Sequence, residues 1–442
     1  MKYSFCIIRP EVLHHELYLV SSRAADMNET YSKGEFYMQK KIIAVAVAAA
    51  LATPGLSFAV GAFDENIVIY GAARVSYDLL DNGNGTGGRN GTGTATNGTT
   101  VNKVSSNTSK IGFKGKEDLG DGLYSIWQIE TQVNFDDSST NPQGGGLGSR
   151  NTYGGLTSDH FGTIRLGRYD TPYKVSTRKF DLFGDTLFDT RALTGGAPGI
   201  SSAVAFDGRP TNTVNYLSPS FNGFTVNAAY AAEAEAATTS AQTKGKLWSI
   251  AGTYDVSPLY VTLAYEEHDF GTPGTAGGAN GGGSFGATNG TAGVGFAGFP
   301  GAPSGSKEKA TKVGLGYDID AFNFGFAYET TSDDEGAGGA DQFGHNTYYL
   351  SGKYTFGTDA LRVAYTKAGQ VGSFANSEAK LYSIGYDHSL SKRTTLYAAY
   401  GALKNGSGIN YPLTFANGTG ANASSAFGAK ISGLSFGMNH AF

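Results

Sequence analysis

The chain has 442 residues and is poor in several residue types that other classes of protein need. It contains one cysteine, two tryptophans and 12 prolines, and charged residues make up only 16% of it, against a usual quarter. The cysteine, Cys6, precedes the predicted cleavage site, so disulfides cannot stabilise the exported product. After residue 60 no apolar run is long enough for a helix to cross a bilayer. These absences exclude a disulfide scaffold and a helical membrane protein.

The residues that are abundant favour short strands joined by polar loops. There are 65 glycines, 26 tyrosines and 27 phenylalanines. The formal net charge is −5, and a small negative balance remains once the predicted export segment is removed. That balance excludes a broad basic surface for nucleic acid.

The front end contains an export signal that begins at Met38 rather than at Met1. Lys40 and Lys41 form a basic region, residues 42–52 are apolar but too short to span a bilayer, and Ser57-Phe58-Ala59 fits a cleavage site. We therefore predict a signal peptide over 38–59 and a mature domain over 60–442. Residues 1–37 are best explained by a start site assigned too early, and a functional extension is the alternative.

Most of the mature chain alternates with a period of two, which predicts β-strands with one apolar face. The last residues show it clearly, with Leu434, Phe436, Met438, His440 and Phe442 on one face. We predict about sixteen strands of roughly ten residues, with connections that are alternately short and long. Residues 81–104 and 269–307 are predicted as long polar loops. The fold class is all-β, a 16-stranded antiparallel transmembrane β-barrel.

One long connection breaks this rhythm. Residues 167–196 follow a predicted strand, carry no alternation, and contain acids and bases in close succession: Asp181, Asp185, Asp189, Lys174, Arg178, Lys179 and Arg191. Long ordered connections within a domain are usually functional. We predict that it folds inward across the barrel and narrows a water-filled lumen. An external surface loop of mixed charge is the alternative.

If the apolar face of each strand meets lipid, the opposite face points into the lumen. That parity places a set of charged residues inside: Arg74, Lys110, Lys114, Glu130, Arg165, Glu329, Lys353, Arg362 and Lys380. So many charges predict a hydrated interior. Arg168 has the parity of the lipid-facing Ile164 and Leu166, and we expect a bend to redirect it inward.

Residues that could support catalysis are scattered. The five histidines of the mature chain have no metal-ligand spacing, and no serine, histidine and acid stand in a suggestive order. We therefore predict no catalytic residues, no metal, no cofactor and no enzyme activity.

Several short segments resemble the Gram-negative general porins, above all the proteobacterial trimeric ones. They are Ile69-Tyr70-Gly71, residues 109–115 (SKIGFKG), residues 167–172 (GRYDTP), residues 216–223 (YLSPSFNG) and the terminal Phe442. The resemblance implies a homotrimer of barrels in the outer membrane, each with its third loop folded inward. It also implies contact with outer-membrane lipid and lipopolysaccharide, and an assembly signal at Phe442 that is read by the outer-membrane assembly machinery.

In that family an acidic loop faces basic wall residues. The resemblance implies Lys110 and Arg168 as wall bases and Asp181 and Asp185 as loop acids. We add Asp189 and Arg178 to the loop set, and Arg74, Glu130, Arg165 and Arg362 to the wall set. The family's Pro-Glu-Phe-Gly-Gly motif is reduced here to Leu182-Phe183-Gly184-Asp185, and a basic position is Leu217.

The expected function is a general diffusion porin that passes ions and small hydrophilic solutes, constricted by a charged loop over 170–211. A solute-specific channel is one alternative. An adhesin or structural barrel with binding loops is another, and the Gly-rich loop over 269–307 leaves it open.

Overall fold

The computed structural model describes residues 67–136, 146–195, 206–232, 246–269, 307–334, 338–413 and 426–442. The chain divides into two units, Met1–Leu56 and Ser57–Phe442, and only the second contains described residues. The predicted extension 1–37, the signal peptide 38–59 and residues 270–306 of the Gly-rich loop lie outside the described ranges.

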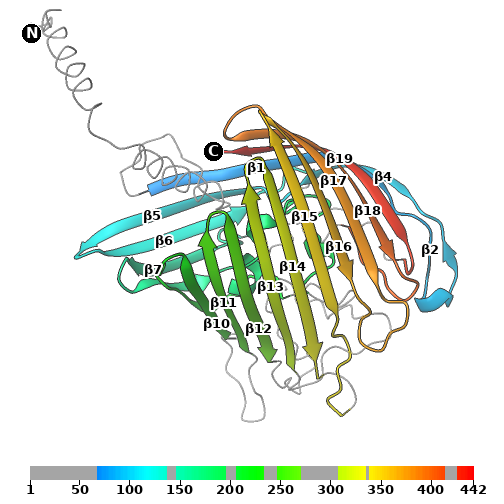
Figure 1. The fold of residues 1–442 in the computed structure, drawn as a ribbon, viewed down its shortest axis with the longest axis horizontal. Coiled ribbons are helices and arrows are strands. Elements are labelled where there is room, and N and C mark those ends of the chain that lie inside the picture. Colours follow the sequence, from blue (N-terminus) through cyan, green and yellow to red (C-terminus); the bar gives the residue numbers. More distant parts are fainter. Residues whose placement is uncertain are drawn as a thin grey trace, which may run out of the picture. The chain divides into compact units, whose positions relative to one another are not determined.

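The second unit is a wall of antiparallel strands that follow one another in chain order (Figure 1). The wall strands are β1 (Ile67–Asp81), β4 (Thr100–Ser106), β5 (Lys110–Gly120), β6 (Leu123–Gln132), β7 (Thr152–Ser158), β8 (Gly162–Arg168), β9 (Thr213–Leu217), β10 (Phe224–Ala232), β11 (Lys246–Val256), β12 (Leu259–Asp269), β13 (Lys307–Ile319), β14 (Phe322–Asp333), β15 (Asn346–Phe356), β16 (Asp359–Ala368), β17 (Ala379–Ser389), β18 (Thr394–Asn405) and β19 (Lys430–Ala441).

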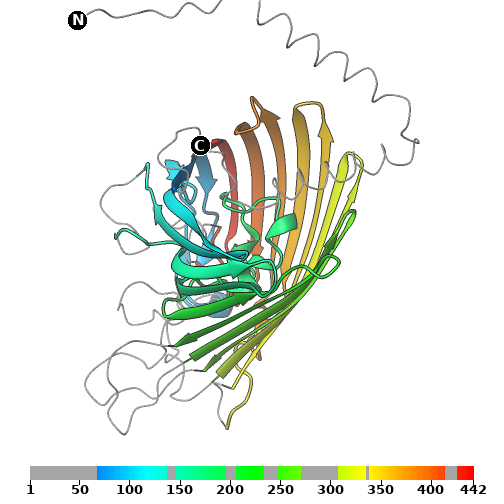
Figure 2. The same ribbon diagram turned by 90° about the vertical axis from the view of Figure 1, so that its left-hand side faces the viewer.

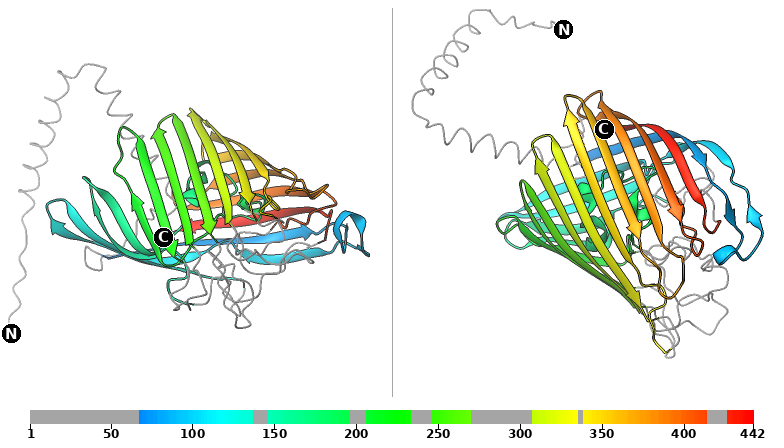
Figure 3. Two further views of the ribbon diagram at one scale, coloured as in Figure 1. Left: turned by 90° about the horizontal axis from the view of Figure 1, so that it is seen from below. Right: turned by 45° about the vertical axis from the view of Figure 1, so that its right-hand side comes forward.

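The wall closes on itself, which confirms the predicted barrel. β1 pairs with β19 along one edge, from Ala72 opposite Ala441 to Asp81 opposite Ser432. Its other edge pairs with β4 and β5, which lie end to end and share one position, so the wall has sixteen strand positions among the described residues. Figure 3 shows the red β19 beside the blue N-terminal strands. Closure leaves no unpaired edge, which a barrel in lipid requires.

The period-two pattern sets which side chains face outward. On β12, β17 and β19 the outward residues Leu263, Ile384 and Phe436 are 57%, 51% and 50% exposed. Their inward neighbours are buried, as Thr262 and Ser435 show. An apolar outer face and a polar inner face are what a transmembrane barrel needs.

The chain turns tightly at one end of the barrel and loosely at the other. Gly120-Asp121-Gly122 joins β5 to β6 with three positive φ angles of 89°, 53° and 72°. The connections at the opposite end are longer, as between β1 and β4 or between β8 and β9. In bacterial outer-membrane barrels the long loops are extracellular.

One predicted loop is partly strand. We expected loop throughout 81–104, but residues 100–106 form β4, and Val101, Lys103 and Ser105 point inward from it. β2 (Gly85–Thr86) and β3 (Ala95–Thr96) add a small separate sheet, and η1 (Arg89–Gly91) lies between them. The prediction failed because β4 is rich in Thr, Asn and Ser, so its outward residues are not clearly more apolar than its inward residues.

Among the described residues, the remaining short helices lie in the predicted charged loop: α3 (Pro172–Val175), η2 (Arg178–Phe180) and η3 (Thr190–Ala192). Within the described ranges, no helix has the length and apolar character to cross a membrane.

Candidate functional site

The charged loop, residues 170–211, leaves the wall at a bend after β8. Gly167 has a φ of 145°, and a Cβ there would lie 2.4 Å from the carbonyl oxygen of Thr152, so only glycine fits. Arg168 follows as a half-buried residue and interacts electrostatically with Arg209 and Asp170 of the loop. The predicted bend is therefore present at this position.

The loop begins with a capped turn that is held by two distant strands. The Thr171 hydroxyl accepts a hydrogen bond from the Lys174 amide at 3.2 Å, and Pro172 occupies the first helical position of α3. The Tyr173 amide donates to Ser249 Oγ of β11 at 3.0 Å. Its hydroxyl donates to Glu329 Oε2 of β14 at 2.7 Å.

The chain then runs along the inner faces of β12 to β16. The ring of Phe180 lies 6.0 Å from that of Tyr260 and 6.5 Å from that of Tyr349. The Leu182 amide donates to the Tyr349 hydroxyl at 3.1 Å. The guanidinium of Arg362, on β16, donates to the Leu182 carbonyl. Figure 2 shows these green turns between the two sides of the wall.

An apolar cluster fixes residues 183–193 of the loop to the inner wall. Phe183, Leu187, Phe188 and Leu193 of the loop are at most 1% exposed. They belong to one cluster with inward side chains of β1 and β16 to β19, which include Leu80, Ala368, Leu381, Tyr397, Leu403 and Ile431. Described residues of the loop therefore contact inward side chains of β11, β14, β16 and β1.

Six charged residues gather where the loop approaches β1, and we call them the loop cluster: Arg74, Arg178, Asp181, Asp185, Asp189 and Arg191. Arg74 Nη1, on β1, lies 2.5 Å from Asp185 Oδ2. Arg178 lies 3.2 Å from the other oxygen of Asp185, and Arg191 lies 3.0 Å from it. Although burial opposes ionisation, Arg178, Arg74 and Arg191 hold the pKa of Asp185 well below its usual range.

The other two loop acids differ in their partners. Asp189 is 1% exposed and makes a bond of 2.6 Å to Arg191, which lowers its pKa despite burial. Asp181 has only a contact of 3.3 Å to Arg178, which it shares with Asp185 and Asp189. Burial and the negative charge of Asp189 raise the pKa of Asp181 to about 7.

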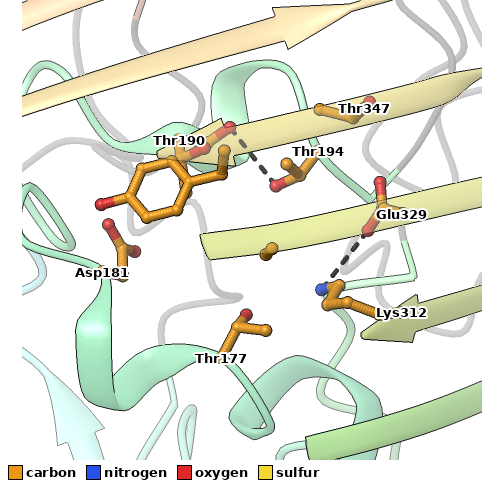
Figure 4. Close-up of a pocket in the computed structure, with 9 residues that line it drawn as sticks. Thr177, Asp181, Thr190, Thr194, Lys312, Glu329 and Thr347 are labelled. Carbon is orange, nitrogen blue, oxygen red and sulfur yellow. Dashed lines mark hydrogen bonds and ion pairs between the residues drawn. The ribbon is translucent and has the colours of Figure 1, made fainter. Parts of the chain in front are cut away.

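Asp181 also lines a small polar pocket between the loop and β13 to β15 (Figure 4). The pocket is walled by four threonines, 177, 190, 194 and 347, and by Lys312, Ala327, Glu329 and Tyr349. Lys312 Nζ lies 3.3 Å from Glu329 Oε2. Asp181 Oδ1 has no hydrogen-bond partner among the described residues. The pocket thus holds one compensated acid and one that is poorly compensated.

A second group of charges lines β5 to β8 and the root of the loop, and we call it the basic wall: Lys110, Lys114, Arg150, Arg165, Arg168, Lys174 and Arg209. Two carboxylates accompany these seven cations. Glu130 is held by Lys110 at 2.9 Å and by Arg150 at 2.7 Å. Asp170 is held by Lys174 at 2.8 Å and by Arg209 at 3.0 Å.

Three cations of the basic wall have no carboxylate partner among the described residues. Arg165 donates to Asn215 Oδ1 at 2.9 Å, and its guanidinium lies 4.6 Å from the centre of the Tyr169 ring. The ammonium of Lys114 lies 5.2 Å from the centre of the Tyr70 ring. The third, Arg168, has a buried Nε without a hydrogen-bond partner. These contacts leave their positive charge largely uncompensated.

The predicted residues therefore fall into two groups and a seam. Asp181, Asp185, Asp189 and Arg178 lie in the loop cluster, where Asp185 contacts Arg74. The guanidinium of Arg362 donates to the backbone of the same loop. Lys110, Glu130, Arg165 and Arg168 belong to the basic wall. Phe442 exchanges two backbone hydrogen bonds with Gly71, of 2.9 and 3.1 Å, where β19 closes on β1. A side chain at Gly71 would collide with the Phe442 ring at 2.3 Å.

One predicted inward residue points the other way. Lys380 is two residues before Tyr382, which is 42% exposed, whereas its neighbour Leu381 is fully buried. Period-two alternation therefore places Lys380 on the outer face, and its assignment to the lumen was wrong.

Sequence reasoning missed several residues of the site. Lys312 could have been found, because it has the opposite parity to Val313 and Leu315. Arg191 carried a weak signal, two residues after Asp189 in a predicted acidic loop. Arg150 and Arg209 lie outside strands, so no alternation marks them. Within the described ranges, no group of histidine, cysteine and acidic side chains is arranged to hold a metal ion.

Comparisons with known proteins agree with this architecture. The family model described as Gram-negative porin matches residues 44–408. Outer membrane porin protein 32 of Delftia acidovorans is 26% identical over 92% of this chain and 100% of its own length. Major outer membrane protein P.IB of Neisseria lactamica is 25% identical over 87% of this chain and 98% of its own.

Solved structures share the fold. The anion-selective porin from Comamonas acidovorans superposes with a TM-score of 0.64 at 21% identity, over 85% of this chain and 99% of that one. OmpT of Vibrio cholerae superposes with a TM-score of 0.56 at 16% identity, over 87% and 100%. The match of the family model over most of the chain agrees with the closed barrel. The chain therefore belongs to the Gram-negative porin family and is an outer-membrane β-barrel.

Proposed function

We propose that the barrel is a general diffusion channel for ions and small hydrophilic solutes, that the charged loop narrows its lumen, and that it weakly prefers anions. The charge balance carries this proposal. The loop cluster has three arginines for three aspartates, whereas the basic wall has seven cations for two carboxylates. Fixed charges at a constriction set the ion preference of a pore.

The function needs no bond making or breaking, so we propose no enzyme activity. The basic wall and the one poorly compensated acid of the loop, Asp181, create a transverse field across the water-filled gap. A polar solute that carries a dipole can align in this field and keep part of its hydration, whereas an apolar solute gains nothing from it. The name of the similar structure from Comamonas acidovorans, an anion-selective porin, agrees with the proposed sign.

The reversal potential of the purified protein in a planar bilayer, under a KCl gradient, tests the sign of the selectivity. One uncompensated unit charge about 8 Å from a passing ion changes its energy in water by about 0.5 kcal/mol, or its permeability about twofold. We expect chloride to be favoured over potassium by a few fold. A cation-selective potential at neutral pH would contradict the proposed role of the basic wall.

Two other functions remain distinguishable from this one. A solute-specific channel would show conductance that one solute blocks, whereas we expect no saturable block. An adhesin with a plugged lumen would pass no sugar in a liposome-swelling assay, whereas we expect swelling that declines with sugar size. The Gly-rich loop that motivated the adhesin lies mostly outside the described residues.

We also propose the partners that the resemblance implied: a homotrimer in a bilayer containing lipopolysaccharide, inserted by the outer-membrane assembly machinery through the C-terminal Phe442. The site of Phe442 at the seam, bonded to Gly71, supports a role in closing the barrel. Cross-linking in native outer membranes tests the trimer. Yield of the Phe442→Ala variant in the outer membrane, compared with Phe436→Ala on the same face of β19, tests the signal.

A further inference from the structure

Cations on the inner face of β5 lie over tyrosine rings of neighbouring strands. Lys116 Nζ is 3.4 Å from the centre of the Tyr124 ring on β6, and Lys114 Nζ is 5.2 Å from the centre of the Tyr70 ring on β1. The face of an aromatic ring attracts a cation, and the attraction is stronger where water is partly excluded. The inner wall here therefore presents positive charge and aromatic surface together, and a third arrangement of this kind, on β7 and β8, involves two rings.

Arg165, on β8, lies against two tyrosine rings at once, and we call the three side chains the aromatic corner: Arg165, Tyr153 and Tyr169. Its guanidinium is 4.6 Å from the centre of the Tyr169 ring and 5.5 Å from that of the Tyr153 ring. The two rings have centroids 5.3 Å apart and planes at 78° to each other. Two nearly perpendicular rings and one guanidinium therefore meet at one point of the wall.

The aromatic corner faces the interior of the barrel. Arg165 lies between Ile164 and Leu166, which are 42% and 57% exposed on the outer face, so the alternation of the strand directs it inward. Tyr153, on β7, is directly opposite Gln128 on the inward face of β6. All three residues of the corner are half-buried, so part of each remains open to a solute.

The guanidinium of the aromatic corner is only partly paired. Arg165 Nη1 donates to Asn215 Oδ1 at 2.9 Å, which is a neutral partner. Among the described residues, Arg165 has no carboxylate partner, and its buried Nε has no hydrogen-bond partner. Hydrogen bonds between arginine and a carboxylate are among the stronger ones in proteins. A carboxylate on a passing solute would supply the negative charge that this site lacks.

The other two tyrosines are less suited to a solute. Tyr70 is 3% exposed, and its hydroxyl donates to Glu130 Oε2 at 3.0 Å, so its ring is covered. Tyr124 is half-buried, but Asp118 is directly opposite it on β5. The carboxylate of Asp118 offsets the charge of the nearby lysine and repels an anion. An uncompensated cation and accessible rings therefore coincide at the aromatic corner.

We propose that the aromatic corner favours small aromatic carboxylates, such as benzoate, over aliphatic carboxylates of the same charge and similar size. The carboxylate pairs with Arg165, and the aromatic ring lies edge-to-face against a tyrosine ring, as aromatic pairs prefer. A saturated ring keeps the ion pair and loses the aromatic contact. The inference rests on the proposed diffusion channel and specifies which solutes its lumen favours. The contact is weak, so these solutes pass without saturating the channel.

The test compares benzoate with cyclohexanecarboxylate, which has the same charge and a similar size but no aromatic ring. Reversal potentials of the purified mature protein in a planar bilayer are measured in gradients of the two potassium salts at pH 8, where both acids are ionised. We expect benzoate to be about threefold more permeant, the factor that one partly exposed aromatic contact supplies. Tyr153→Leu should bring the ratio close to one, and Tyr153→Phe, which keeps the ring, should preserve it.

Tyr317→Leu is the matched control, because this tyrosine is 40% exposed on the outer face of β13, and it should leave the ratio unchanged. Arg165→Gln removes the cation and should lower the permeability of both carboxylates, each about twofold. If Tyr153→Leu does not insert into the bilayer, Tyr169→Leu removes the other ring of the corner and should also lower the ratio.

Three results would overturn the proposal: a wild-type ratio of one, a ratio that survives in both Tyr153→Leu and Tyr169→Leu, or an equal loss in Tyr317→Leu. A loss of chloride preference in Tyr153→Leu as large as the loss of the ratio would mean that the ring only positions Arg165, which also overturns it. The proposed function is judged separately, from chloride and potassium in KCl. Because the two carboxylates carry the same charge, their ratio does not depend on the sign of the selectivity.

Discussion

The loop cluster and the basic wall handle charge differently. The loop cluster is nearly closed on itself, because Arg74, Arg178 and Arg191 hold Asp185 and Asp189 through five contacts of 2.5 to 3.9 Å. The basic wall has cations without carboxylate partners among the described residues, such as Arg165, Lys114 and Arg168. We propose a division of work: the balanced charges hold the loop in place, and the surplus charges act on passing ions.

The largest effect should come from breaking an ion pair of the loop cluster. Asp189→Ala removes a buried carboxylate and leaves Arg191 with only its longer contact, of 3.0 Å, to Asp185. Removing one member of a buried ion pair typically costs about 3–5 kcal/mol, because the other charge stays buried. We expect the charged loop to leave the wall more readily, measured as faster trypsin cleavage at Arg178 and Arg191 in the intact barrel.

The control removes a loop-to-wall ion pair that is exposed. Asp255, on β11, pairs with Lys179 of the loop, and its side chain is 47% exposed. Exposed pairs contribute about 0–1 kcal/mol. Asp255→Ala should therefore leave the cleavage rate nearly unchanged. Equal cleavage in both variants would show that the loop is not held by its internal charges.

The wall of this barrel was largely predictable, and the anchoring of the loop was not. Strict alternation on β19 from Leu434 to Phe436 identifies an outward face without any knowledge of neighbours. The same rule predicts Arg74 and Arg362 inside. Counted from Tyr382, it places Lys380 on the outer face, so our assignment of Lys380 to the lumen was wrong. β4 was missed because its residues are polar on both faces.

The contacts of the loop depend on residues far away in the sequence. Leu187 and Phe188 have no periodic context, and their partners Leu381 and Leu403 are about two hundred residues further along the chain, as their numbers show. Arg191 could have paired with several acids, and only the docked position of the loop selects Asp185 and Asp189. A sequence can suggest an acidic loop and a basic wall, but the pairing follows from where the apolar cluster holds the loop.

A moderate effect should come from removing surplus cations from the basic wall. Lys114→Gln with Arg168→Gln removes two cations that have no carboxylate partner among the described residues, so no buried acid is left unpaired. At about twofold per charge, the chloride preference should fall about fourfold or reverse. Reversal potentials under a KCl gradient measure this change.

The matched control removes a cation that is not part of the basic wall. Lys309→Gln removes an exposed charge from the outer face of β13. Its effect on selectivity should be negligible, because the barrel wall and water separate it from the lumen. If the two wall substitutions leave selectivity unchanged, the surplus cations do not line the path of the ions.

The smallest effect should come from the one loop acid that the arginines do not fully compensate. With its pKa raised to about 7, Asp181 is neutral below that pH and ionised above it. Raising the pH from 5.5 to 8.5 should therefore add one negative charge beside the lumen and lower the chloride preference by no more than about twofold. Half of the change should occur near pH 7.

Two substitutions separate this titration from other pH effects. Asp181→Asn should abolish the step near pH 7. Asp185→Asn should shift selectivity toward anions at every pH and keep the step, because the pKa of Asp185 lies well below the range tested. A step that survives in Asp181→Asn belongs to another group. In that case Asp181 does not titrate between pH 5.5 and 8.5, because its charge is compensated as fully as that of Asp189.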